Sequence, residues 1–172
     1  SNRQIIPKNS RTTMRLILCV SLFVVLGCSS TIQPSKTIKK EEIVFNTISK
    51  GTLFGNGIEG ILEEKFTIKN EKQWQVFLNK INSVNSVSSS FSEININFSN
   101  HIIICVFDAI RNTGGYAIEI KRVFVEKNNL NIVYTKKGPG PMEMVTTAIT
   151  QPYHIVKIEK RGEDHKFINK NQ

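Results

Sequence analysis

The residue types that most often carry catalysis are few in this 172-residue sequence, and their spacing matches no catalytic motif. The histidines His101, His154 and His165 form no H-E-x-x-H pair, and no two cysteines have the spacing of a zinc site. Cys105 and His154 could form a nucleophilic dyad if the fold brought them together. Cys105, however, lies in an apolar run, where no neighbouring cation would lower the pKa of its thiol. The sequence therefore predicts no enzyme, no metal site and no cofactor.

Residues 55–60 match the pattern G-x-G-x-x-G, which in dinucleotide-binding proteins opens a helix whose N-terminus binds the pyrophosphate. Here the residues that follow alternate between apolar and polar, as in Phe66 and Ile68 against Lys65 and Thr67, which is typical of a strand. The pattern is better interpreted as a flexible turn than as a phosphate site.

The most informative polar stretch is a loop between two apolar runs. It consists of Arg111, Asn112, Thr113, Gly114, Gly115 and Tyr116. The run before it, residues 102–107, is continuously apolar, as in a strand buried on both faces, and residues 116–121 alternate as in a strand with one wet face. The Gly-Gly pair between them predicts a hairpin. Because loops on rigid strands often bind partners, we expect a partner-binding element here, with Asp108 holding a turn beside it.

A second loop, residues 137–143, contains Gly138, Pro139, Gly140 and Pro141. If the C-terminal strands form an up-and-down meander, successive turns alternate between the two ends of the sheet. The first and third turns then share an end, so we predict one binding surface made of both loops.

The elements that must position these loops belong to a single domain, residues 42–160. Its clearest helix follows Asn70, where Trp74, Phe77, Leu78 and Ile81 stand at i, i+3, i+4 and i+7. Asn70 can cap this helix. A first strand is expected over residues 42–52, and residues 161–172 are expected to form a frayed tail. The predicted fold class is α+β: a mainly antiparallel β-sheet, arranged as a meander, with one amphipathic helix packed on it.

Residues 1–27 are expected to be an upstream extension and a lipoprotein signal peptide. The apolar run of residues 16–26 is too short to span a bilayer, and it ends in Val25, Leu26, Gly27 and Cys28, which resembles a lipobox. The resemblance implies a lipid on Cys28, and residues 28–41 are polar enough to be a flexible tether. We therefore expect a bacterial cell-envelope protein, anchored in the membrane by lipid on the periplasmic or outer-membrane face.

The charge of the chain does not point to nucleic acid. Its formal net charge is +9, but four of the basic residues lie in residues 1–27 and the others are scattered. A nucleic-acid surface needs clustered cations, usually with aromatic side chains beside them.

Residues 98–160 resemble the C-terminal domain of the PrcB family, bacterial lipoproteins named for a partner of a subtilisin-like protease. The resemblance rests on the strand at residues 102–107, on the loop at residues 111–116 and on a distal element. The distal element consists of Thr147, Pro152, Tyr153, Ile155 and Val156. Asn112 departs from the family pattern, which has proline there. The resemblance implies a non-catalytic accessory subunit that binds and stabilises a secreted protease, with no small-molecule substrate.

Two alternatives remain open at the level of sequence. The stretch Thr113, Gly114, Gly115 and Tyr116 is also similar to the Thr-Thr-Gly-Tyr loop of chagasin-type inhibitors of cysteine proteases, although their Arg-Pro-Trp motif is missing. The other alternative is a structural envelope lipoprotein in which the loop is simply a turn.

Overall fold

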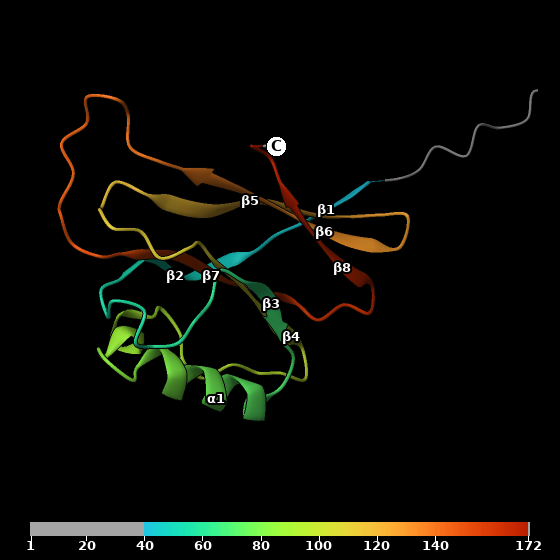
Figure 1. The fold of residues 1–172 in the computed structure, drawn as a ribbon. Coiled ribbons are helices and arrows are strands. Elements are labelled where there is room, and N and C mark those ends of the chain that lie inside the picture. The colour runs from blue at the N-terminus through green and yellow to red at the C-terminus, as the bar shows by residue number, and fades with distance from the viewer. Residues whose placement is uncertain (1–39, 172) are drawn as a thin grey trace, which may run out of the picture. The chain divides into compact units, whose positions relative to one another are not determined.

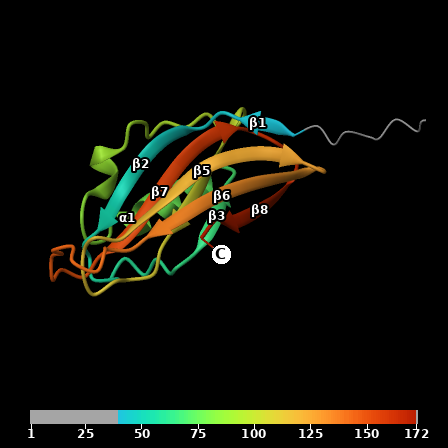
Figure 2. The same ribbon diagram turned by 90° about the horizontal axis from the view of Figure 1, so that it is seen from above.

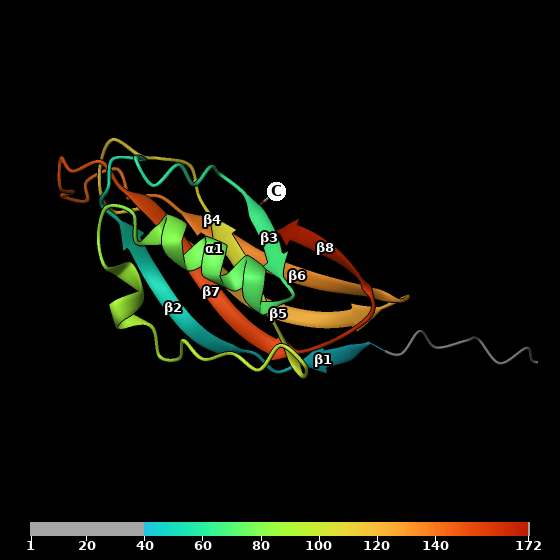
Figure 3. The ribbon, with the colours of Figure 1, turned by 90° about the horizontal axis from the view of Figure 1, so that it is seen from below.

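The computed structural model describes residues 40–171, which form three layers (Figure 1). An outer sheet has the strand order β1-β5-β6-β8, and a middle sheet has the order β2-β7-β4-β3. Helix α1 covers the other face of the middle sheet (Figure 3). The strands are β1 (Glu41–Ile43), β2 (Asn46–Leu53), β3 (Lys65–Ile68), β4 (His101–Phe107), β5 (Ala117–Glu126), β6 (Asn129–Lys137), β7 (Gln151–Glu159) and β8 (Asp164–Asn169); α1 spans Glu71–Ile81 and a 3-10 turn, η1, spans Val87–Ser90.

Strand β4 shows why the fold has three layers. Its side chains alternate between two cores: Ile103, Cys105 and Phe107 pack toward α1, whereas Ile102, Ile104 and Val106 pack against the outer sheet. A strand that is apolar on both faces must be covered on both faces, and β4 accordingly lies inside the middle sheet between β7 and β3. The prediction of a strand buried on both faces is confirmed.

Helix α1 is also confirmed. The Asn70 side chain accepts a hydrogen bond from the Gln73 amide at 2.9 Å. The Gln73 side chain in turn accepts one from the Lys69 amide at 2.8 Å, so two amides at the helix start are satisfied. The predicted apolar stripe of Trp74, Phe77, Leu78 and Ile81 is buried against the middle sheet. The mainly antiparallel α+β class with one α-helix therefore holds for residues 40–171.

The meander and the hairpin at residues 111–116 are not found. β4 pairs with β3 and β7, whereas β5 pairs with β1 and β6, so the loop between β4 and β5 passes from the middle sheet to the outer sheet. The reason lies in the two burial patterns: β4 needs cover on both faces, whereas β5 exposes polar side chains such as Lys121 and Arg122 to water. A Gly-Gly pair permits a tight reversal, but it does not decide which sheet the next strand joins.

Two further boundaries differ from expectation. Residues 42–52 do not form one strand, because the chain leaves the outer sheet after β1 and enters the middle sheet as β2. The tail expected to be frayed instead contains β8, which pairs in parallel with β6 from Asn129 opposite Asp164 to Tyr134 opposite Asn169. Phe167 of β8 packs against the core between the sheets. No helix within residues 40–171 is long and apolar enough to cross a membrane.

Candidate functional site

Three loops of the domain meet at one end, which we call the loop end. They are the 54–64 loop between β2 and β3, the 108–116 loop between β4 and β5, and the 138–150 loop between β6 and β7. Strand register brings them together, because Leu53 lies opposite Gln151, Phe107 opposite Tyr153, and Ala117 opposite Lys137. Figures 1 and 2 show the loops on one side of the molecule and β1 on the other.

A buried carboxylate joins these loops. Asp108 is 0% exposed, and its Oδ2 accepts hydrogen bonds from Arg111 Nε at 3.1 Å and Nη2 at 2.8 Å. Its Oδ1 lies 2.7 Å from Lys136 Nζ, and Lys136 also pairs with Glu63 of the 54–64 loop. We call Asp108, Arg111, Lys136 and Glu63 the Asp108 cluster. The expectation that Asp108 holds a turn is confirmed, and the residue also links β6 and a second loop.

Burial by itself would raise the pKa of Asp108, but the contacts with Lys136 and Arg111 outweigh it and hold that pKa below 3.8. Burial likewise acts to lower the pKa of Lys136, whereas Asp108 and Glu63 raise it above 10.5 overall. Both groups are therefore charged at neutral pH. They neutralise each other and so are poorly suited to acid or base catalysis.

Hydrogen bonds to main-chain atoms also join the three loops. The Gln151 side chain donates to the Ile61 carbonyl oxygen at 2.9 Å and to the Asp108 carbonyl oxygen at 3.1 Å. Arg111 and Thr150 exchange two backbone hydrogen bonds, from Arg111 N to Thr150 O at 2.7 Å and from Thr150 N to Arg111 O at 2.8 Å. Each of these contacts joins two of the loops or their flanking strands, so the loop end has a defined geometry.

The glycines and prolines singled out in the sequence lie against one another. The Gly114 amide donates to the Thr146 carbonyl oxygen at 3.0 Å. Gly115 has a φ of 82°, and a Cβ atom added there would lie 2.8 Å from a methyl of Val145 and 3.0 Å from Pro139. Only glycine fits both this backbone conformation and this contact. The prediction that the two loops share an end is therefore confirmed, although sheet crossings produce the contact where a meander was expected.

The other predicted site residues divide into two groups. Asn112, Gly115, Gly138, Gly140 and Pro141 are exposed. Arg111, Thr113, Gly114, Tyr116 and Pro139 are half-buried. The Arg111 guanidinium lies 4.7 Å from the centre of the Tyr116 ring while it also binds Asp108. Arg111 and Tyr116 therefore support the shape of the loop, whereas the residues of the first group are accessible to solvent. Cys28 lies outside the described residues.

The groups that could do chemistry elsewhere are separated or engaged. Cys105 faces the core under α1, and burial raises the pKa of its thiol well above 9.0. His154 lies on the opposite face of the middle sheet, where its Nδ1 accepts from the Ile120 amide at 2.9 Å and its Nε2 lies 3.0 Å from Thr47 Oγ1. The imagined Cys105–His154 dyad is therefore not formed. Within the described part of the chain no group of three metal-binding side chains comes together.

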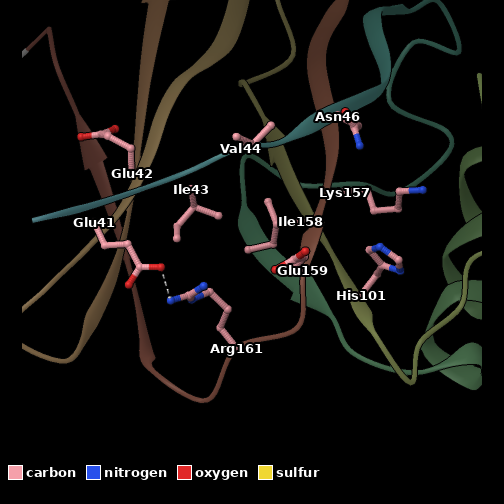
Figure 4. A pocket seen from close by; sticks show the side chains of 10 residues that line it. All are labelled: Glu41, Glu42, Ile43, Val44, Asn46, His101, Lys157, Ile158, Glu159 and Arg161. Atoms are coloured by element: carbon pink, nitrogen blue, oxygen red, sulfur yellow. Dashed lines mark hydrogen bonds and ion pairs between the residues drawn. The ribbon is translucent and has the colours of Figure 1, made fainter.

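A hollow of about 340 Å³ lies at the other end of the domain, beside the chain between β1 and β2 (Figure 4). Charged side chains line it, but several are already paired: Arg161 binds Glu41 at 2.9 Å, Arg122 binds Glu42, and Lys157 binds Glu93. These pairs hold the strand crossing in place. They leave the loop end as the better candidate site.

Taken together, residues 40–171 form a mainly β domain of two sheets and one α-helix, with a connected set of loops at one end. Residues 102–159, which include β5, β6, β7 and both predicted loops, match the PrcB C-terminal family. This match confirms the resemblance to the PrcB C-terminal domain that residues 98–160 predicted. No match was found among curated proteins or among solved structures.

Sequence reasoning missed the 54–64 loop as part of the site, together with Lys136 and Gln151 as the residues that connect it. No local signal marks them. Lys136 is one of two adjacent lysines at a strand end, and Gln151 stands before a proline, so only the register of the strands brings them to Asp108.

Proposed function

We propose that this protein is a non-catalytic accessory subunit of a protease complex and binds its partner through the loop end. The observation that carries the proposal is the PrcB C-terminal match, because it spans both loops that the Asp108 cluster and Thr150 hold in place. Loops that are ordered before binding lose less conformational entropy on association, which favours a contact role.

The absence of catalysis in this proposal is supported by how the titratable groups are used. The Asp108 carboxylate is neutralised by two cations, and the Cys105 thiol is buried in an apolar core. Burial lowers the pKa of His154 to about 4, so the ring is neutral at physiological pH with both nitrogens engaged. A general base needs a free nitrogen or oxygen within reach of a substrate.

The finer proposal is that the partner is a secreted, subtilisin-like protease that this subunit stabilises, and that a lipid on Cys28 anchors the complex in the cell envelope. The first described strand supports this arrangement. Glu41 pairs with Val125, far along β5 from Ala117 and the loop end. A tether that precedes β1 would therefore be attached at the end of the domain opposite the loops. The loops would then face a partner and not the membrane.

The test is affinity capture of the full chain from its native cells after cross-linking, followed by mass spectrometry, with protease abundance measured in cells that lack the protein. We expect one secreted peptidase to be captured and its abundance to fall in the deletion strain. If no peptidase is captured and protease levels are unchanged, the subunit proposal is wrong. Cys28→Ser should release the protein from the membrane fraction, and retention there would disprove the anchor.

A second candidate function is inhibition of a cysteine protease. It is favoured by the position of Thr113, Gly114 and Gly115 at one end of two sheets, where a loop could enter an active-site cleft. The full chain would then slow papain at micromolar concentration, and Gly115→Val would weaken that inhibition. An unchanged papain rate would remove this candidate. If neither a protease partner nor inhibition is found, the structural-lipoprotein alternative remains.

A further inference from the structure

The loop end exposes much of the apolar surface of the domain. Of the twelve large apolar side chains that the described residues expose, seven lie in the 54–64, 108–116 and 138–150 loops, which make up about a quarter of residues 40–171. The six most exposed of these seven are Phe54, Ile58, Leu62, Ile110, Met142 and Met144. We call these six residues the apolar loop surface. Scattered apolar residues are normal on proteins, but such a concentration at one end marks an interaction site.

The apolar loop surface is held by contacts between its loops. A Cβ atom added at Gly57 would lie 2.4 Å from Ile110 Cδ1, so Ile110 packs directly on the 54–64 loop at Gly57. The 138–150 loop is joined through the hydrogen bond from the Gly114 amide to Thr146. Met142 and Met144 are 97% and 98% exposed, so they contribute almost nothing to the core of this chain.

The three loops of the loop end contain a single cation, Arg111, and it is paired with Asp108. Asp108 is paired with Arg111 and Lys136, and Lys136 also pairs with Glu63. The 138–150 loop carries a single charged residue, Glu143, whose carboxylate accepts from the Gly140 amide at 2.9 Å. An anionic lipid surface or a nucleic acid would be recognised by free cations beside the apolar residues. The centre of a protein interface, in contrast, is depleted of charge and enriched in methionine and aromatic side chains.

We infer that the apolar loop surface is the contact site for a folded protein whose own contact patch is apolar and uncharged. The 54–64 loop, outside the family match at residues 102–159, is thereby part of the interface. The identity of that protein as a protease rests on the proposed function. The apolar character of its contact patch is inferred from the residues of the apolar loop surface alone. The flexible thioethers of Met142 and Met144 can adapt their shape to the partner.

The first experiment places a photoreactive benzophenone side chain at Met142 or at Ile58 of the full chain in its native cells. Val44 is the control position, because it is 84% exposed and apolar but lies between β1 and β2, away from the loop end. We expect both loop positions, and not Val44, to cross-link to the same protein, through a segment of that protein that is apolar and uncharged. Cross-links between two copies of this chain, or none from either loop position, would overturn the inference.

The second experiment measures affinity for that cross-linked protein after its purification. The double variant Met142→Glu/Met144→Glu should bind about tenfold more weakly or worse, while Val44→Glu binds as the wild type does. Wild-type affinity should change by less than about threefold between roughly 50 mM and 500 mM salt, because screening acts on charges and not on apolar contacts. If the Met142→Glu/Met144→Glu variant binds as tightly as the wild type, the inference is overturned, even if the partner is a protease. A partner that is not a protease would instead overturn the proposed function and leave the surface standing.

A membrane is the competing occupant, and vesicles distinguish it. The Cys28→Ser full chain, which should carry no lipid, is mixed with vesicles of phosphatidylethanolamine and phosphatidylglycerol. We expect no difference in vesicle binding between this chain and the same chain with Met142→Glu/Met144→Glu. Vesicle binding that disappears with the double substitution would assign the surface to lipid and refute the protein partner.

Discussion

Removal of the Asp108 charge should weaken the whole loop end. In Asp108→Asn the side chain keeps its shape, but Arg111 and Lys136 lose the carboxylate that both of them contact. Breaking a fully buried ion pair by removing one partner costs about 3–5 kcal/mol. Here the Arg111 and Lys136 side chains are 33% and 21% exposed, so water partly compensates them. We therefore expect the free energy of unfolding to fall by about 2–3 kcal/mol.

The matched control is Glu63→Gln, which removes the other partner of Lys136. The Glu63 side chain is 42% exposed, so its loss should cost less than about 1 kcal/mol. A difference between these two variants would separate the buried member of the Asp108 cluster from its exposed member.

The chain contains a natural probe for this measurement. Trp74 is its single tryptophan and is 0% exposed beneath the middle sheet, so its fluorescence reports unfolding during a urea titration of the full chain. The pKa of Asp108 is lowered in the folded state, so the stabilisation from its charge is present above the unfolded pKa and is lost as the pH falls through the folded value. Asp108→Asn should therefore lose less stability than the wild type on acidification below about pH 4. A cost at neutral pH within about 0.5 kcal/mol of zero would refute the role assigned to this carboxylate.

Three other predictions follow from burial and backbone geometry. The pKa of His154 falls from 6.5 to about 4 because of its burial, so the unfolded chain binds the extra proton between these values. The free energy of unfolding of the wild type, measured by urea titration, should drop by up to about 2–3 kcal/mol as the pH is lowered through this window, and a His154→Leu variant should show a flatter profile. Gly115→Val should displace the 108–116 loop and abolish capture of the partner. The control Gly162→Val should leave capture unchanged, because no atom lies within 4 Å of the added carbon. Equal capture by both variants would contradict the loop geometry. Phe167→Ala should cost about 2 kcal/mol in the same titration because Phe167 packs between the sheets, whereas Ile168→Ala, at a 40% exposed position, should cost under about 1 kcal/mol. Equal costs would indicate that β8 does not stabilise the domain.

Local patterns predicted those elements whose form depends on near neighbours. The helical spacing of Trp74, Phe77 and Leu78 indicated α1, and the capping residue Asn70 marked its start correctly. The unbroken apolar run ending at Phe107 indicated a strand covered on both faces. These features repeat every two or every 3.6 residues, so a short window contains all the information that they need.

Local patterns failed where the chain changes sheets. The Gly114-Gly115 pair is compatible with a hairpin and also with a crossing between sheets, and the observed connection is the crossing. Strand β8 was missed because its sequence is mostly polar, with Phe167 as the apolar side chain that packs between the sheets, and because its parallel pairing with β6 is long-range. The prediction that the two loops lie at the same end was confirmed, because β5 and β6 pair from Ala117 opposite Lys137.

The sequence by itself determined helix α1, the position of β4 as a strand covered on both faces, and the loop residues that match the PrcB C-terminal family. Tertiary structure alone decided that Asp108, Lys136 and Glu63 meet, and that a third loop brings Gly57 against Ile110. The physical reason is range. Propensity and periodicity act over a few residues, whereas the Asp108 cluster and the apolar loop surface arise from strand pairings between segments tens of residues apart, which no local pattern encodes.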